Sequence, residues 1–203
     1  MARRGFHHPR RDPGWRTGNP ARLDGTVSRS VLLLDLDGVL NPFAASSCPD
    51  GYLEHEFYPG EGPERYCPAH AAWITELATA GDLHWASAWG EDANTLYGTV
   101  LGVEPLPVVP FPPLPFPPEA KVPAVAAVAG DRPLAWIDDN HTEAGRRWAA
   151  ERSAPTLLVP VDSAIGWTRA DVDRVLAWAA GLARLTQAVR RSARGRSGCP
   201  PCR

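Results

Sequence analysis

Short apolar runs alternate with longer amphipathic segments along most of this chain. The apolar runs fall at 31–36, 83–87, 133–140 and 156–160. Each run is about as long as a strand, and an almost unbroken apolar run is typical of a strand that is buried on both faces of a parallel sheet. Because helical segments lie between the runs, the pattern predicts an α/β fold, a three-layer sandwich with a mostly parallel sheet.

The amphipathic segments carry recognisable helix ends. Gly81 follows the first segment as a stop signal. Thr168 and Asp171 form a variant of the capping box at the start of the last segment. Helices are expected at 69–80, 91–97, 121–129, 141–151 and from 168 to about 182.

The region between the first strand and the first helix has a different composition. Residues 42–67 are rich in Pro, Gly, Ser and Cys, and polar and aromatic positions alternate at 51–58. This alternation predicts a small hairpin that lies over the end of the sheet. The region is too short to form a domain of its own.

Composition and charge divide the chain into one domain and two basic ends. A chain of 203 residues is long enough for one domain with a full hydrophobic core. Residues 1–28 are rich in Pro, Gly, Arg and His, and residues 186–203 carry arginines but no acid. We expect both ends to be weakly ordered basic tails around a folded domain at 29–185. Such tails can hold a nucleic acid electrostatically or be solvated extensions, and the sequence leaves both possibilities open.

Neither a secretion signal nor a membrane-spanning segment is expected. The N-terminus is basic, but the first apolar run begins only at Val31 and is soon interrupted by Asp35. Four cysteines in a chain of this size do not suggest a disulfide framework, so we expect a cytoplasmic protein. Cys199 and Cys202 have the spacing of a metal-binding or redox pair, although one pair supplies only half of a zinc site.

Proline dominates residues 104–118, which therefore cannot form a helix or a central strand. One interpretation is a docking site for a partner that recognises proline. The other is a stiff strap that packs Phe111 and Phe116 onto the domain, with Val108 and Val109 as a short edge strand. We favour the strap because the segment is internal and rich in apolar residues.

The first apolar run ends in two carboxylates, Asp35 and Asp37, followed by Gly38. Alternate residues of a strand point to the same side, so both carboxylates should face one way. The carboxyl ends of strands in open α/β sheets are where ligands bind. Because the two acids would repel each other if unpaired, we expect them to share a cation.

Further polar residues follow the other strands in order. Ser87 ends the second run, Lys121 begins a helix, and Asp138 with Asp139 ends the third run. Lys121 is the only lysine in a chain with 21 basic residues, which makes its position informative.

Together with Asp-Leu-Asp-Gly-Val at 35–39, these residues resemble the four motifs of the haloacid dehalogenase (HAD) superfamily. The resemblance covers about residues 30–185 and points to a subgroup without a cap domain. It implies a Rossmann-like sheet, dependence on Mg²⁺ and phosphoryl transfer through an aspartyl phosphate.

Each motif residue has a role that phosphoryl transfer needs. Asp35 is expected to attack phosphorus, and Asp37 to protonate the leaving oxygen and later to deprotonate the attacking water. Ser87 would donate hydrogen bonds to a phosphate oxygen, and Lys121 would supply a compact positive charge. Ser87 could equally be a small residue that ends a strand, and Lys121 a solvated residue of the first helical turn.

The metal ligands are expected among four acids. Mg²⁺ would be bound by the carboxylate of Asp35, the carbonyl of Asp37 and the carboxylate of Asp138. Asp139 would orient a metal-bound water or Lys121. The sequence does not separate Asp138 from Asp139 as the direct ligand, and we prefer Asp138.

The resemblance narrows the reaction more than the substrate. Within the superfamily an aspartate at the position of Asp37 marks phosphatases and phosphomutases, which favours hydrolysis of a phosphomonoester. Only about 27 residues separate Asn41 from the helix at Ala69, too few for a large cap domain, so an open active site is expected.

Open sites in this superfamily often act on bulky substrates. One alternative is therefore a phosphatase that processes nucleic-acid ends, with the basic tails as contacts and Trp89 or Tyr52 stacking on a base. A small metabolite or a protein phosphate is the other substrate class. An alternative of a different kind is a non-catalytic module that binds partners through the proline-rich segment.

Overall fold

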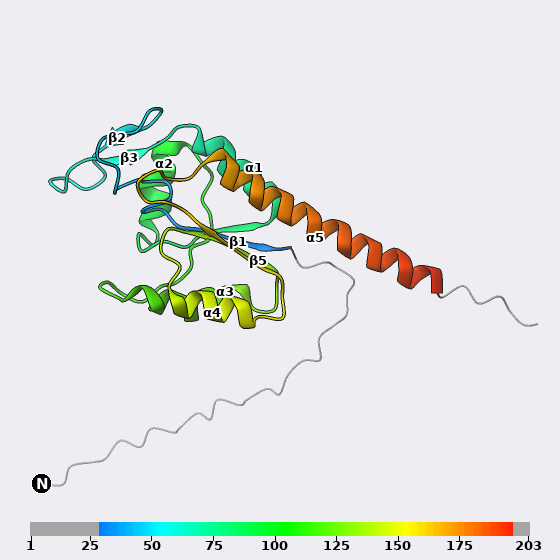
Figure 1. Ribbon diagram of the computed structural model, residues 1–203. Coiled ribbons are helices and arrows are strands. Elements are labelled where there is room, and N and C mark those ends of the chain that lie inside the picture. Colours follow the sequence, from blue (N-terminus) through cyan, green and yellow to red (C-terminus); the bar gives the residue numbers. More distant parts are fainter. Residues whose placement is uncertain (1–28, 197–203) are drawn as a thin grey trace, which may run out of the picture.

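A four-stranded sheet in which all neighbouring strands are parallel forms the centre of the computed structural model, which describes residues 29–196 (Figure 1). Val31–Leu34 (β1) and Leu134–Asp138 (β5) are the two inner strands, and both are fully buried. Asp82–Trp85 (β4) and Thr156–Pro160 (β6) flank them, in the order β4-β1-β5-β6. The predicted α/β class with a mostly parallel sheet is confirmed.

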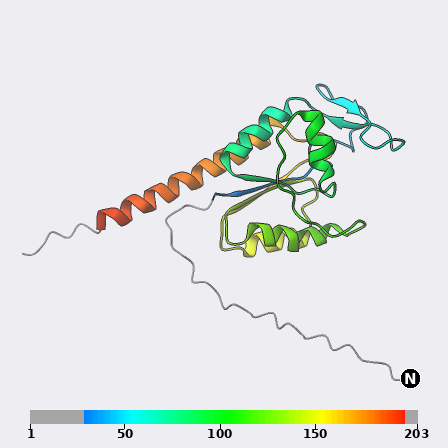
Figure 2. The same cartoon turned by 180° about the vertical axis from the view of Figure 1, so that it is seen from behind.

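Helices cover both faces of the sheet and make the three layers that Figures 1 and 2 show. His70–Ala80 (α1) and Arg169–Arg196 (α5) pack together on one face, and Lys121–Ala129 (α3) and Glu143–Glu151 (α4) lie on the other. Alternate side chains of a strand point to opposite faces of the sheet, so each face has its own core and needs its own layer of helices.

Alternate residues of β1 show this division. Leu32 and Leu34 belong to the core under α1 and α5, whereas Val31 and Leu33 belong to the core under α3. Every one of these side chains is fully buried, which explains why the run is apolar without alternation.

The order of the strands determines where a ligand site can form. From β1 the chain passes through α1 to β4 on one side, and later returns through α3 to β5 on the other side of β1. The connections that follow β1 and β5 lead to opposite sides of the sheet. The carboxyl ends of these two strands therefore form the switch point where open α/β sheets bind ligands.

The proline-rich segment packs along the edge of the sheet, as the strap interpretation predicts. Val108 forms a parallel bridge with Trp85, and the amide of Val109 donates to the carbonyl of Trp85 at 2.8 Å. Phe111 packs against the core under α3, and its ring centroid lies 5.8 Å from that of Phe116. The segment then enters the short 3₁₀ helix Pro118–Ala120 (η2), which leads directly into α3.

The small hairpin predicted between the first strand and the first helix is present. Leu53–His55 (β2) pairs in antiparallel orientation with Glu64–Tyr66 (β3), so the hairpin extends beyond 51–58. Its turn includes Gly60 and Gly62, both with positive φ, which a glycine adopts without strain.

The predicted helix at 91–97 is present. Most of it is a π-helical turn, Ala93–Gly98 (η1), followed by Thr99–Leu101 (α2). Asn94 anchors this turn because its side chain bonds both the indole of Trp85 and the backbone of Leu106. Such long-range anchoring explains the departure from the regular helix that the local pattern predicts.

The last helix is longer than the expected range of 168 to about 182. α5 continues through residues 186–196 to Arg196 and extends past the sheet (Figure 1). Ala, Arg and Gln favour a helix there. Residues 1–28, with the predicted N-terminal tail, and residues 197–203, with Cys199 and Cys202, lie outside the described residues.

Between residues 29 and 196, no helix combines the length and the apolar character that a membrane crossing requires. The cytoplasmic location stays a prediction from the sequence.

Candidate active site

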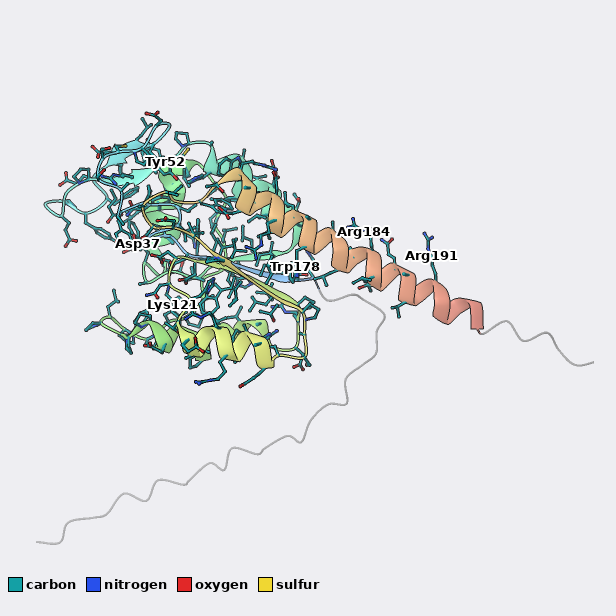
Figure 3. The ribbon with its side chains drawn as sticks, in the orientation of Figure 1. Asp37, Tyr52, Lys121, Trp178, Arg184 and Arg191 are labelled. Carbon is teal, nitrogen blue, oxygen red and sulfur yellow. The ribbon has the colours of Figure 1, made fainter. Side chains whose placement is uncertain are left out.

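The structure brings all six predicted site residues to the carboxyl ends of β1, β4 and β5. Five of them, Asp35, Asp37, Ser87, Lys121 and Asp139, line one cavity of about 270 Å³. The sixth, Asp138, is fully buried at the end of β5 and contacts Lys121. Figure 3 shows Asp37 and Lys121 at the same end of the sheet, although they come from different segments.

Lys121 lies between the two buried carboxylates. Its Nζ donates to Oδ2 of Asp35 and, at 2.8 Å, to Oδ2 of Asp138. The side chain of Lys121 is 12% exposed, that of Asp35 5% and that of Asp138 0%. Lys121 is therefore not a solvated residue of a first helical turn. We call these three residues the Lys121 triad.

The Lys121 triad joins two acids to one base. Burial and the neighbouring Asp138 raise the pKa of Asp35 well above its usual range, and the nearby Lys121 does not fully offset them. Burial lowers the pKa of Lys121, but the two carboxylates outweigh burial and hold that pKa above its ordinary value. Lys121 is therefore charged at neutral pH.

Asp138 is fixed by several donors. Its Oδ2 accepts a hydrogen bond from the indole of Trp136 at 3.1 Å, and its Oδ1 accepts one from the amide of Asn140 at 2.8 Å. With Lys121, these donors hold the carboxylate in one orientation, which a preformed charged site requires. Asn140 contributes through its backbone amide, so the turn at this residue helps to fix the carboxylate of Asp138.

Asp35, Asp138 and Asp139 form a group that fits a hard cation. One carboxylate oxygen of each lies within 4.8 Å of the others. The donors are all carboxylate oxygens, which Mg²⁺ prefers. Burial first, and then the neighbouring Asp138, raise the pKa of Asp139 above its usual value. The carboxylate of Asp37 is not part of the group.

Gly38 permits the two acidic segments to approach each other. A Cβ at this position would lie 2.2 Å from Oδ2 of Asp139, and the φ of Gly38 is +73°. Any other residue would displace Asp139 and strain the turn. The glycine of the first motif is thus required by the contact between the ends of β1 and β5.

Asp37 is held by two donors that the sequence did not assign to it. The indole Nε1 of Trp89 donates to one oxygen at 2.9 Å, and Nδ2 of Asn41 donates to the other at 3.2 Å. The only signal for Trp89 is its position two residues after Ser87, because residues so spaced often face the same way.

Trp89 is not an open platform for a base. Its ring packs against Phe57, Tyr58 and Tyr97, with centroid distances of 5.4, 5.3 and 5.9 Å. The hydroxyl of Tyr52 is buried, and its ring packs against His70. The stacking roles suggested for Trp89 and Tyr52 are therefore not supported by their positions.

Ser87 is 2% exposed and faces the cavity. Its Oγ accepts only a long hydrogen bond, 3.4 Å, from the amide of Trp89. The hydroxyl proton of Ser87 thus remains available for an acceptor in the cavity. This arrangement suits a donor to a phosphate oxygen.

In comparisons with known proteins, no family model, no curated protein and no solved structure matches this chain. The likeness to the HAD superfamily rests on the motif residues and stays a prediction.

Proposed function

We propose that this protein is a Mg²⁺-dependent phosphomonoester hydrolase that acts through an aspartyl phosphate on Asp35. The observation that carries the proposal is the Lys121 triad beside a cavity that Asp37 also lines. A phosphoryl-transfer site needs a positioned nucleophile, neutralising charge and a proton for the leaving oxygen. The cavity holds a candidate for each.

Asp35 is the nucleophile in this proposal. Its Oδ1 accepts a hydrogen bond from the amide of Leu36 at 2.7 Å, and its Oδ2 accepts one from Nζ of Lys121. The carboxylate therefore has a fixed orientation beside the cavity that it lines. Attack on phosphorus forms the aspartyl phosphate and splits hydrolysis into two easier steps. Lys121 offsets the negative charge of the nucleophile and the incoming phosphate.

Asp37 is the general acid and base. It lies two residues after Asp35, and Trp89 and Asn41 each hold one of its oxygens. A carboxyl held in one orientation can give a proton to the leaving oxygen and then take one from the attacking water. Such help is typically worth about 10²–10⁴-fold in rate.

Mg²⁺ would be held by Asp35, Asp138 and Asp139, with the carbonyl of Asp37 as a further oxygen ligand. When bound, the ion neutralises charge on the phosphate oxygens. Ser87 donates to a phosphate oxygen independently of the metal. Three acids gathered around one lysine support a divalent cation here.

The alternatives have less support. The strap packs Phe111 onto the core and pairs Val108 with the sheet, which leaves less of it free for a partner. Arg184 and Arg191 are exposed on α5, and Figure 3 places them at the opposite end of the molecule from Asp37. The described basic residues of α5 therefore do not favour a nucleic-acid end as the substrate.

The test compares the wild type with Asp35→Asn on 4-nitrophenyl phosphate, with Mg²⁺ and with EDTA. A broader panel of phosphomonoesters, including 3′- and 5′-phosphorylated oligonucleotides, runs in parallel. We expect Mg²⁺-dependent turnover by the wild type and a loss of at least about 10³-fold in Asp35→Asn. Equal turnover by both proteins, or none by the wild type across the panel, would contradict the proposal.

A further inference from the structure

Two chemical kinds of residue line the cavity. The polar residues include those of the candidate site, which bind phosphate and metal in the proposal above. The other lining residues are apolar: Phe43, Ala88, Leu114, Phe116 and Pro118.

Two of these apolar residues are unusually exposed for their size. The side chain of Phe43 is 58% exposed and that of Leu114 is 67% exposed. Exposed large apolar residues that gather around a polar cavity are typical of ligand sites. We call Phe43, Leu114 and Phe116 the apolar rim.

The segment that carries Phe43 is firmly held. Nη1 of Arg65 donates to the carbonyls of Pro42 and Ala45, each at 2.9 Å. The amide of Phe43 also donates to the carbonyl of Asn41 at 2.8 Å. The ring of Phe43 is thus displayed by an anchored turn that directly follows the first motif.

The other side of the apolar rim comes from the strap. The ring centroids of Phe116 and Phe111 lie 5.8 Å apart, and Phe111 packs against the core under α3. The amide of Val109 bonds the strap to the edge strand β4. The apolar rim is therefore built from two segments, each fixed to the domain. Pre-positioned groups bind a ligand with a smaller loss of conformational entropy.

The apolar rim selects against polar leaving groups. Its side chains offer neither donors nor acceptors, so a sugar or polyol would lose hydrogen bonds to water without replacement. Among residues 29–196, Lys121 is the only cationic side chain that lines the cavity, and it already contacts two carboxylates. These residues therefore offer no further cation to a leaving group with additional negative charge. An aromatic ring, in contrast, gains from burial against the rim.

From these features we propose that the apolar rim binds the leaving group, and that the substrate is an aryl phosphomonoester. The aromatic ring carries the phosphate directly and lies against Phe43, Leu114 and Phe116. A cavity of about 270 Å³ is near the lower end for a whole ligand, so the phosphate and one ring occupy it and any larger remainder lies outside. The proposal rests on the hydrolase function above and specifies its substrate class.

The first experiment measures binding, so that it does not depend on turnover. Phenylphosphonate and methylphosphonate, which cannot be hydrolysed at the carbon–phosphorus bond, are titrated into the full-length protein with Mg²⁺ by calorimetry. We expect phenylphosphonate to bind at least about tenfold more tightly, from the apolar area that the ring buries. Phe43→Ala should reduce this preference to less than about threefold and leave methylphosphonate binding unchanged.

Leu53→Ala is the matched control, because Leu53 is 50% exposed but does not line the cavity. It should keep the full preference for phenylphosphonate. Equal binding of the two phosphonates by the wild type, or an unchanged preference in Phe43→Ala, would overturn the aryl proposal.

Turnover then separates this proposal from the one on which it rests. Phenyl phosphate is compared with glycerol 2-phosphate and with nucleoside 3′- and 5′-monophosphates. A higher kcat/KM for phenyl phosphate supports the aryl class. Mg²⁺-dependent hydrolysis that favours glycerol or nucleoside phosphates overturns the aryl proposal alone. Turnover of none of these esters, together with binding of neither phosphonate, counts against both proposals.

Discussion

Two charged triads border the central strand β1 at opposite ends and have opposite arrangements of charge. At the carboxyl end, the cation Lys121 lies between Asp35 and Asp138. At the amino end, the anion Asp82 lies between Arg29 and Arg132, at 3.4 and 2.8 Å. Each triad links segments that are distant in the chain.

Burial distinguishes the two. The side chains of Arg29, Asp82 and Arg132 are 52%, 39% and 30% exposed, so water screens their charges. The Lys121 triad is almost wholly buried, and each charge in it depends on the others. The same number of ion pairs therefore gives a solvent-screened surface contact at one end and a buried, fixed charge cluster at the other.

Removal of the central charge should separate the triads most clearly. In Lys121→Met two buried carboxylates lose their cation, and we expect the free energy of unfolding to fall by about 3–5 kcal/mol without metal. Millimolar Mg²⁺ should restore part of the loss, because a cation bound to the folded state stabilises it. Urea unfolding in EDTA and in Mg²⁺ measures both effects. An unchanged midpoint in EDTA would show that the carboxylates do not need Lys121.

The orientation of Asp37 should matter for catalysis more than for stability. Trp89→Phe keeps the aromatic packing but removes the donor to Asp37, and we expect kcat for an alkyl phosphate to fall about tenfold. A good leaving group such as 4-nitrophenolate needs less protonation, so its turnover should fall less.

Trp85→Phe provides the control, because the indole of Trp85 donates to Asn94 rather than to an acid of the cavity. It should not alter the ratio of the two rates. An equal loss on both substrates in Trp89→Phe would show that the indole does not act through the proton transfer.

The gathering of acids at the carboxyl end should affect the pH dependence of stability. Glu64 on β3 has a pKa raised to about 7, by burial first and then by Asp37 and Glu61. Between its unfolded value of about 4.5 and 7, the folded state binds more protons than the unfolded state, so stability falls as pH rises. Glu64→Gln removes this loss.

The variant should therefore match the wild type at pH 4 and exceed it above pH 7 by on the order of 1 kcal/mol. Urea unfolding at the two pH values in EDTA measures the difference. A variant that is less stable than the wild type at pH 8 would mean that ionised Glu64 is stabilised in the folded protein.

The smallest effect is expected at the exposed triad. Asp82→Asn removes the anion shared by Arg29 and Arg132, and we expect a loss of no more than about 1 kcal/mol. The loss should shrink in high salt, which screens surface charges. A loss as large as that of Lys121→Met would show that exposure does not distinguish the triads.

Local chemistry explains which features the sequence could predict. The strand 156–160, the helix 121–129 and the capping pair Thr168 and Asp171 depend on neighbours in the chain, and the structure contains all of them. The sequence predicted a hairpin and a helix, but the partner of β2 and the π-helical form of η1 depend on distant residues and could not be predicted. The basic composition after 185 does not end the last helix, because charge does not prevent a helix of Ala and Arg.

The sequence alone determined that polar residues end three apolar strands and that a parallel sheet would gather them at one edge. Strand periodicity and the rule that binding sites lie at the carboxyl ends of parallel strands suffice for that conclusion. Only the tertiary structure decided that Lys121 joins Asp35 to Asp138, that Trp89 holds Asp37 and that Phe43 borders the cavity. These contacts depend on rotamers, burial and packing between segments as many as 86 residues apart, which no local pattern specifies.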